Sequence, residues 1–263
     1  QTRKGGYNVQ QSNAYIITFS VILTVVLGLL LSGTSEILKP IQKKAEELDT
    51  KKQILGAVIP AESIAEMKPE EVNEFYESRI SSVVVNIEGE EITEQDGVEI
   101  TAETVDVGKN FKKEPEERLF PVFIFLEEGS EDAALAYVLP VYGNGLWDKI
   151  WGYVALKTDM DTIEGVTFSH AGETPGLGAR ITSLDVQQRY KDKSIYSEDG
   201  ELVSVNMQKG EGKDYSGDPH KIDGMSGATI TANGVNNMLK NYLNYYQSYM
   251  DKKKEGSSEV AMN

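Results

Sequence analysis

The sequence predicts an α+β protein with a single N-terminal transmembrane helix, followed by a domain in which helices flank an antiparallel sheet. Residues Ala14 to Leu31 are almost wholly apolar. Strand-like runs fill the middle of the chain, and from Val235 to Met250 apolar residues recur at spacings of three and four, as in an amphipathic helix. Because the strands come in runs with helices on either side, they favour an α+β domain over a doubly wound sheet.

The apolar segment approaches the roughly 20 residues that a helix needs to cross a bilayer. Arg3 and Lys4 precede it, which favours a cytoplasmic N-terminus and places the rest of the chain outside the cytoplasm, although lysines also follow the segment. A cleaved signal peptide would have a shorter apolar region and a small-residue cleavage site, and Ser32 to Ser35 lacks an A-x-A pattern. We therefore expect a retained anchor, and a few residues before Gln1, which is not a Met.

These patterns divide the chain into five parts. We expect a cytoplasmic N-terminus over 1–13, a transmembrane helix over 14–33, a juxtamembrane helical segment over 34–65, a periplasmic domain over 66–250 and a polar, mobile C-terminal tail over 251–263. Within the domain, helices are expected over 66–80 and 181–193, and strands over 83–85, 119–126, 134–141, 150–156, 163–169 and 202–207. Asn144-Gly145 predicts that residues 142–145 form a hairpin turn. The highly charged stretch 95–117 is expected to be a surface excursion.

Composition excludes several classes of function. The net charge of −16, from 26 basic and 42 acidic residues, argues against a nucleic-acid partner, since phosphate backbones need Lys and Arg. The absence of cysteine excludes disulfides, iron–sulfur clusters and thiolate-bound haem on this chain. With only two histidines, a His-rich zinc or haem site is not expected either. Any redox chemistry would therefore need an organic cofactor or a partner protein.

The stretch from Asp223 to Thr231 is rich in glycine and hydroxyl residues and leads directly into the last helix. Ser226, Thr229 and Thr231 thus fall just before or within its first turn, where side-chain oxygens accept unpaired N–H groups. The same N–H groups and the helix dipole attract phosphate. A hydroxyl at this place can cap the helix, contact a ligand or serve as an attachment point.

Two further turns are rich in glycine, at Gly143 to Trp147 and at Gly176 to Gly178. They can be simple tight connections, but glycine also lets a backbone approach a flat ligand closely. Trp147 can belong to the core or form a wall for an aromatic ring. Glu173 and Thr174 can hydrogen-bond a ligand ring or only cap the turn. His170 is expected to be structural, and neither a G-x-S-x-G nor a G-x-x-x-x-G-K-[ST] motif is present to indicate a hydrolase or kinase.

The run Asp223 to Thr229, DGMSGAT, resembles the D-x-x-[ST]-G-A-T signature at which a periplasmic transferase attaches FMN, through a phosphoester, to the hydroxyl of the last Thr. Gly145-Leu146-Trp147, Trp151-Gly152-Tyr153, Glu173 to Gly178 and the single N-terminal span occur in the expected order. Together they resemble the C subunit of the sodium-translocating NADH:quinone oxidoreductase over nearly the whole chain. The G subunit of the Rnf electron-transport complex shares the FMN-binding domain, but the Gly-Leu-Trp run and the long juxtamembrane helix favour the former.

The resemblance implies a flavoprotein of the bacterial inner membrane whose residues 66–250 form a periplasmic FMN-binding domain. One covalent FMN would pass electrons between neighbouring redox centres, with NADH as ultimate donor, quinone as acceptor and coupled Na⁺ export. The implied partners are the other membrane subunits, the flavin transferase and membrane lipid. No catalytic residue and no metal ligand is expected. The cofactor-binding residues implied are Thr229 as the attachment site, Ser226, Gly227, Ala228 and Asp223 around it, and Leu146, Trp147, Glu173, Thr174, Gly176 and Leu177 as further contacts.

Three other interpretations stay open at this point. Thr231 is a rival attachment site, although the motif ends at Thr229. The chain could also be an anchored periplasmic binding or assembly module without redox turnover, in which Thr229 is only an N-cap. A soluble secreted flavoprotein is a third possibility, which depends on whether the apolar segment remains on the mature chain.

Overall fold

The structure is a computed structural model that describes residues 13–95 and 97–261, with the side chains of residues up to 255. The predicted cytoplasmic segment 1–13 therefore lies almost entirely outside the described residues. The chain divides into two compact units, the first ending at Asp49 and the second running from Thr50.

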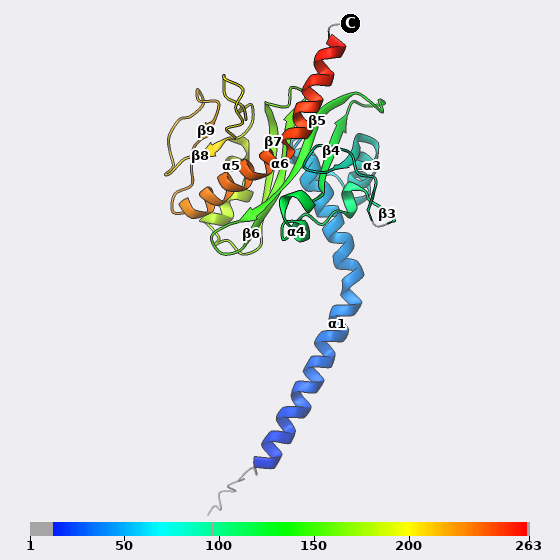
Figure 1. Cartoon of the computed structure of the whole chain (residues 1–263). Helices are drawn as coiled ribbons and strands as arrows, with labels where there is room; N and C mark the ends of the chain where they lie inside the picture. Colours follow the sequence, from blue (N-terminus) through cyan, green and yellow to red (C-terminus); the bar gives the residue numbers. More distant parts are fainter. Residues whose placement is uncertain (1–12, 96, 262–263) are drawn as a thin grey trace, which may run out of the picture. The chain divides into compact units, whose positions relative to one another are not determined.

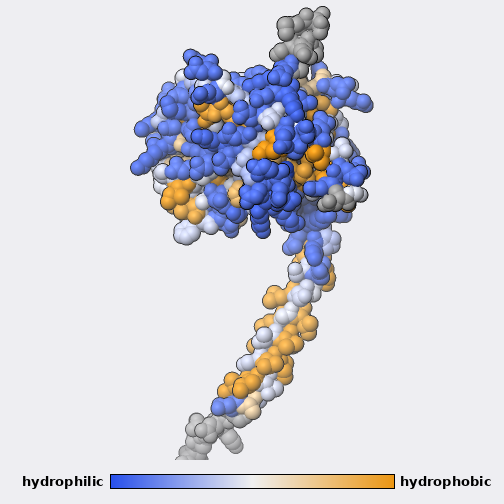
Figure 2. All heavy atoms as spheres, viewed as in Figure 1, coloured by the Kyte–Doolittle hydropathy of each residue, from blue (hydrophilic) through white to orange (hydrophobic). Residues whose placement is uncertain are grey.

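Helix α1 spans Asn13–Gly56. Its residues up to Asp49 belong to the first unit, and its last turns, from Thr50, belong to the second. Apolar side chains surround its first turns (Figure 2), and it is the one helix among the described residues that is long and apolar enough to cross a membrane. The helix continues through Pro40 and ends at Gly56. The end of the predicted juxtamembrane segment 34–65 thus folds with the second unit, where Ile54 and Leu55 are buried.

A five-stranded antiparallel sheet forms the centre of the second unit (Figure 1). Its strands are, in spatial order, β1 Ile80–Val85, β4 Phe120–Leu126, β5 Ala134–Asn144, β6 Lys149–Lys157 and β7 Ile163–His170. Every neighbouring pair is antiparallel, so hairpin connections suffice between β5, β6 and β7. The predicted α+β class with an antiparallel sheet is confirmed.

Helix α6, Thr229–Ala261, covers one face of this sheet. Its apolar positions pack on the strands: Tyr246 meets Phe120 edge-on, and its hydroxyl donates to the carbonyl of Pro121 at 2.8 Å. The crossing is closest at Gly234, where an added Cβ would lie 2.4 Å from the carbonyl oxygen of Asn144. Glycine is therefore needed at this point of the helix for its backbone to touch the end of β5.

The opposite face of the sheet is covered by the end of α1 and by α3, Pro69–Arg79. Thr167 on β7 donates to the carbonyl of Gln53 at 3.0 Å, and Arg79 donates to the carbonyl of Leu126 at 2.8 Å. α3 begins with Pro69 in its first turn and with the Glu71 carboxylate accepting the N–H of Lys68, both typical helix-start devices.

The remaining elements are short. They are α2 Ala61–Glu66, β2 Glu94–Gln95, β3 Val98–Glu99, η1 Ala102–Thr104, α4 Val107–Asn110, η2 Pro115–Glu117, η3 Gly178–Thr182, α5 Leu184–Gln188, β8 Asn206–Met207 and β9 Lys221–Ile222. The small pieces from β2 to η2 make up the predicted charged excursion. The strands β8 and β9 pair in parallel, which places the segment before α6 next to residues 206–207.

Four predicted segments differ markedly from the structure. The predicted turn at 142–145 is wrong: β5 continues to Asn144, which pairs with Lys149, and the chain reverses over 145–148. The predicted helix over 181–193 is only η3 and α5, and the predicted strand over 202–207 is reduced to β8 and a bridge at Leu202. Residues 251–261, predicted as part of a mobile tail, continue α6 as helix.

The contact at Gly234 makes the first prediction. Gly→Ala inside a helix ordinarily stabilises by about 1 kcal/mol. Here the added methyl group meets the Asn144 carbonyl, so Gly234→Ala should destabilise the full chain by about 1 to 3 kcal/mol, as overpacking does. Thermal melting followed by circular dichroism measures this. Gly217→Ala is the control, since nothing lies within 4 Å of its added Cβ; equal melting temperatures for wild type and Gly234→Ala would contradict the prediction.

Candidate functional site

No side chain of the described residues caps the start of α6. The first helical hydrogen bond runs from the N–H of Ala232 to the carbonyl of Ala228 at 2.9 Å, so Thr229 is the first helical residue and Ala228 occupies the cap position. Alanine has no side-chain oxygen to accept an N–H group. Within the part of the chain that the structure describes, the N–H groups of Thr229, Ile230 and Thr231 have no acceptor. The positive end of a long helix thus opens beside the Thr229 hydroxyl.

The first half of the motif is bound into the fold. The Asp223 carboxylate accepts the N–H groups of Gly212 and Lys213 at 2.7 and 3.1 Å. It thereby holds the loop before β9. A Cβ on Gly224 would lie 1.9 Å from the carbonyl oxygen of Gln208, so only glycine fits between these two backbone segments. Asp223 and Gly224 therefore shape the backbone ahead of the helix.

The second half of the motif is a tight turn. The N–H of Ala228 donates to the carbonyl of Met225 at 3.3 Å, and the N–H of Ser226 donates to the Glu211 carboxylate at 3.1 Å. These two N–H groups are used inside the chain, and the free ones follow at 229–231. The Ser226 side chain is exposed, and its hydroxyl makes no hydrogen bond to the described residues. It remains available to a ligand.

An ionic cluster of Arg180, Arg189 and Glu211 holds this turn in place. No sequence motif indicates this cluster. Arg180 donates two hydrogen bonds to the Glu211 carboxylate, one of them at 2.9 Å. Arg189 lies 3.5 Å from the same carboxylate and donates at 2.7 Å to the carbonyl of Gly224. The bonds from Arg180 and from the N–H of Ser226 lower the pKa of Glu211 to about 2. These residues lie on three separate segments, so no local spacing could have predicted the cluster.

The two glycine-rich turns and α6 meet at Glu173, whose side chain is only 4% exposed. One carboxylate oxygen accepts the Thr231 hydroxyl at 2.6 Å, and the other accepts the N–H of Trp147 at 3.0 Å. The Thr231 hydroxyl is therefore buried, and its hydrogen is already used in the bond to Glu173. Burial opposes ionisation of Glu173, but the bonds from Thr231 and from the N–H groups of the 146–148 turn outweigh it and hold its pKa below the usual value.

Large apolar side chains remain exposed around the helix start. Leu146 is 44%, Trp147 70%, Leu177 42% and Ile230 59% exposed. These side chains come from three segments of the chain. The hydrogen bonds of Glu173 hold the segments together. Leu177 also approaches Gly227 closely, since a Cβ on Gly227 would lie 2.9 Å from Leu177 Cδ2. Such a concentration of exposed apolar surface on a water-facing part of a protein is typical of a binding site.

The other predicted contact residues shape the second turn. The carbonyl of Thr174 accepts the N–H groups of Leu177 and Ala179, at 3.1 and 3.2 Å, and the Thr174 side chain is exposed. Gly176 has φ +77°, a conformation that favours glycine. His170, expected to be structural, accepts the N–H of Glu173 at Nδ1. The structure thus brings all the predicted site residues to the start of α6 and the turns beside it.

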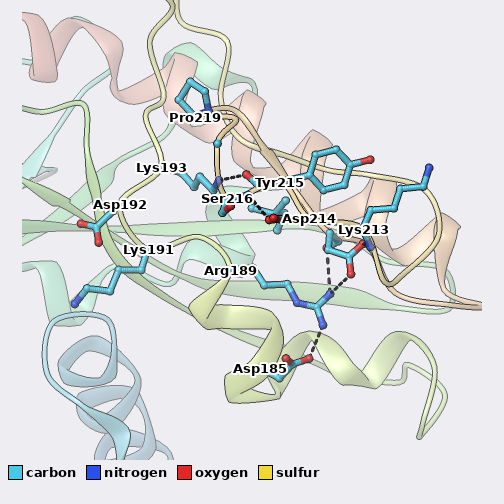
Figure 3. Close-up of a pocket in the computed structure, with 13 residues that line it drawn as sticks. Asp185, Arg189, Lys191, Asp192, Lys193, Lys213, Asp214, Tyr215, Ser216 and Pro219 are labelled. Carbon is cyan, nitrogen blue, oxygen red and sulfur yellow. Dashed lines mark hydrogen bonds and ion pairs between the residues drawn. The ribbon is translucent and has the colours of Figure 1, made fainter.

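A cavity of about 640 Å³ lies between α5 and loop 213–219, and Asp223 is one of the residues that line it (Figure 3). Charged side chains line it, and the Lys193 ammonium is held there by the carbonyls of Tyr215 and Asp218, each at 2.6 Å. Arg189 points from α5 toward Asp185 and the motif. This cavity does not contain the exposed apolar side chains of the three convergent segments, and we do not assign a flat aromatic ligand to it.

The ionic cluster makes a pH-dependent prediction. The folded-state pKa of Glu211 is lowered, so its contribution to stability is present above the unfolded value of about 4.3 and is lost as the pH falls toward about 2. Glu211→Gln should lower the melting temperature at pH 7 and flatten its decline between these two pH values. Melting curves across this range measure both effects, with the exposed Glu198→Gln as control. Parallel pH profiles for wild type and Glu211→Gln would contradict the assignment.

The comparisons with known proteins agree with this geometry. Residues 145–244 match the model of the FMN-binding domain, which begins at the first turn of the site and includes the start of α6. A solved structure of the C subunit of Na⁺-translocating NADH-quinone reductase from Parabacteroides distasonis is 34% identical, with a TM-score of 0.66, over 81% of this chain and 96% of that one. The NqrC structure from Shewanella oneidensis, 24% identical with a TM-score of 0.64, covers 80% and 99% and shares the fold.

Similarity also extends over the N-terminal part of the chain. The C subunit of Na⁺-translocating NADH-quinone reductase from Yersinia pestis is 30% identical over 251 residues, which are 90% of this chain and 91% of the relative. The corresponding protein from Neisseria meningitidis serogroup A is 29% identical and covers 92% and 95%. With its apolar first helix, its antiparallel sheet and its FMN-binding domain, the chain belongs to the family of the C subunit of Na⁺-translocating NADH-quinone reductase.

Proposed function

We propose that this chain carries one FMN, attached covalently through its phosphate to the Thr229 hydroxyl, and passes electrons between neighbouring redox centres on the way to quinone. The observation that carries the proposal is the start of α6. Exposed apolar side chains surround this point, where one hydroxyl and three N–H groups have no hydrogen-bond partner among the described residues. The flavin supplies the redox chemistry, and the chain supplies position and electrostatics.

The phosphate half of FMN fits the helix start. A phosphoester on Thr229 places phosphate oxygens next to the N–H groups of residues 229–231, which lack acceptors in the described chain. The helix dipole favours negative charge there, and the exposed Ser226 hydroxyl can donate a further hydrogen bond. None of the first-turn residues of α6 is acidic, so no neighbouring carboxylate in that turn repels the phosphate.

The ring half of FMN fits the exposed apolar side chains. Trp147 and Leu146 on one turn and Leu177 on the other are exposed large groups at the site, and the flat isoalloxazine ring would cover part of this surface. The backbone of both turns is held from within, at Glu173 and at the carbonyl of Thr174. The ring would thus rest on turns that are fixed before it binds.

The two alternative roles for the hydroxyls are less favourable. Thr229 is the first helical residue rather than the cap, and its hydroxyl accepts no N–H group among the described residues, as an N-cap would. Thr231 is 1% exposed, and its hydroxyl donates to Glu173. Attachment at Thr231 would require that buried bond to break. These observations support Thr229 over Thr231 and a cofactor site over a plain cap.

The membrane side and the partners follow from the same proposal. Arg3 and Lys4 before the apolar segment favour a cytoplasmic N-terminus, so the second unit would be periplasmic, on the inner membrane of a bacterium. A periplasmic transferase would attach the flavin, and the other membrane subunits of the complex would supply and accept electrons. We assign NADH oxidation, quinone binding and Na⁺ transport to those subunits.

The attachment site is tested by substitution in chains produced together with the transferase. Wild type and Thr231→Ala should show flavin fluorescence in a denaturing gel, and intact mass should show one added FMN phosphoryl group. Thr229→Ala should lose the fluorescence completely, because no hydroxyl remains to form the phosphoester. A fluorescent Thr229→Ala chain would exclude Thr229, and a wild-type chain that is never fluorescent would end the flavin proposal.

The membrane topology is tested by labelling introduced cysteines. The chain has no cysteine of its own, so each variant carries a single reactive thiol. A single Asp199→Cys, on an exposed loop, should react with a membrane-impermeant maleimide in intact spheroplasts, since residue 199 would be periplasmic. Ser12→Cys, on the other side of the apolar segment, should react only after lysis. The reverse pattern of labelling would place the second unit in the cytoplasm.

A further inference from the structure

The Glu173 carboxylate is a junction of three chain segments that are distant in sequence. It accepts the Thr231 hydroxyl at 2.6 Å from α6 and the N–H of Trp147 at 3.0 Å from the β5–β6 turn, while its own backbone belongs to the loop after β7. Both Glu173 and Thr231 are buried, at 4% and 1% exposure. A buried carboxylate costs free energy unless its oxygens are hydrogen-bonded. The folded chain therefore favours the conformation in which both donors reach Glu173.

Two glycines make room for this carboxylate. A Cβ on Gly145 would lie 2.3 Å from one of its oxygens, and a Cβ on Gly178 would lie 2.3 Å from the other and 2.5 Å from the Thr231 hydroxyl. Neither position has a φ in the left-handed region, so the space, and not the backbone conformation, requires glycine here. Gly145 and Gly178 therefore make room for the carboxylate rather than for a direct approach to a ligand.

We propose that Glu173 and Thr231 form a positioning clamp, which fixes the Leu146–Trp147 and Leu177 sides of the pocket relative to Thr229 and places a permanent negative charge close to the cofactor. This inference rests on the proposed flavin site. It differs from the expectation that Glu173 hydrogen-bonds the flavin ring, because the carboxylate is buried and each of its oxygens already accepts a hydrogen bond within the chain. Thr231 is then a positioning residue rather than a rival attachment site.

The clamp has a mechanical consequence at Trp147. The side chain of this residue is 70% exposed, so few side-chain contacts hold it, and its position depends on the backbone bond to Glu173. It has an electrostatic consequence as well. Adding an electron to a flavin is less favourable beside a fixed negative charge, and Glu173 is buried, where water screens its charge least. Glu173 should therefore lower the flavin's reduction potential.

The mechanical consequence is measured on full chains without flavin, in a Trp151→Phe background that leaves Trp147 as the single tryptophan. Thr231→Val removes the hydroxyl at nearly constant volume, and the fluorescence anisotropy of Trp147 should fall. Thr231→Ser keeps the hydroxyl and should restore the wild-type value. Thr167→Val is the matched control, because it removes another partly buried hydroxyl bond, to Gln53, on the opposite face of the sheet; it should leave the anisotropy unchanged.

The electrostatic consequence is measured on flavinylated chains. Glu173→Gln keeps the shape, since its amide oxygen can accept the Trp147 N–H and its NH₂ group can donate to Thr231, but it removes the charge. Flavin attachment should persist and the midpoint potential should rise, while Thr167→Val leaves the potential at the wild-type value. A melting curve for each variant establishes that the chains compared are folded.

The outcomes separate this inference from the proposed function. If wild type carries flavin while Thr231→Val leaves the anisotropy unchanged and Glu173→Gln leaves the potential unchanged, the clamp is wrong and the flavin site stands. If Thr231→Val fails to fold, the Glu173→Gln potential alone decides. A wild-type chain that never acquires flavin overturns the proposed function, and with it the cofactor-positioning role of the clamp, whatever Trp147 does.

Discussion

The close crossing of α6 over the end of β5 is the contact on which the site depends. Gly234 lets the helix backbone touch the carbonyl of Asn144, and Gly143 faces Met238 one turn further along, so the helix lies directly on the sheet at this end. The helix is thereby also held beside the 145–148 turn, because a Cβ on Gly234 would lie 3.3 Å from the Cα of Gly145. The same approach brings Thr231 to Glu173 and so to the second turn. A larger residue at Gly234 would lift the helix start away from both turns.

Sequence reasoning predicted the class of fold, and it proposed candidate site residues that the fold brings close together, because both leave local signals. The apolar first helix, the strand runs and the DGMSGAT motif are each contiguous, and local periodicity determines such elements. The end of β5 was misplaced because Asn144-Gly145 usually marks a two-residue hairpin turn. Here Asn144 stays in the strand opposite Lys149, which also donates to its side chain, and the reversal follows over 145–148.

What the sequence could not predict are contacts between distant segments. Glu211 reaches Arg180, Arg189 and Ser226 from a loop of its own, and nothing in the spacing of these residues indicates that they meet. The roles within the motif were equally hidden. A carboxylate next to a phosphate would repel it, but the Asp223 carboxylate accepts two backbone N–H groups of the preceding loop and lies 3.9 Å from the Arg189 guanidinium, which reduces the effect of its charge.

The features that mark the site also carry a cost in the chain without cofactor. A missing N-cap costs about 0.5 to 2 kcal/mol, and the exposed Trp147 and Leu177 leave apolar surface in water. A phosphoester at Thr229 would provide acceptors for the free N–H groups, and a ring on the two turns would cover that surface. The proposed covalent attachment would make both gains permanent, because a cofactor bound through its phosphate cannot be lost by diffusion. The residues that form the proposed cofactor site are thus also the residues that the bound cofactor would stabilise.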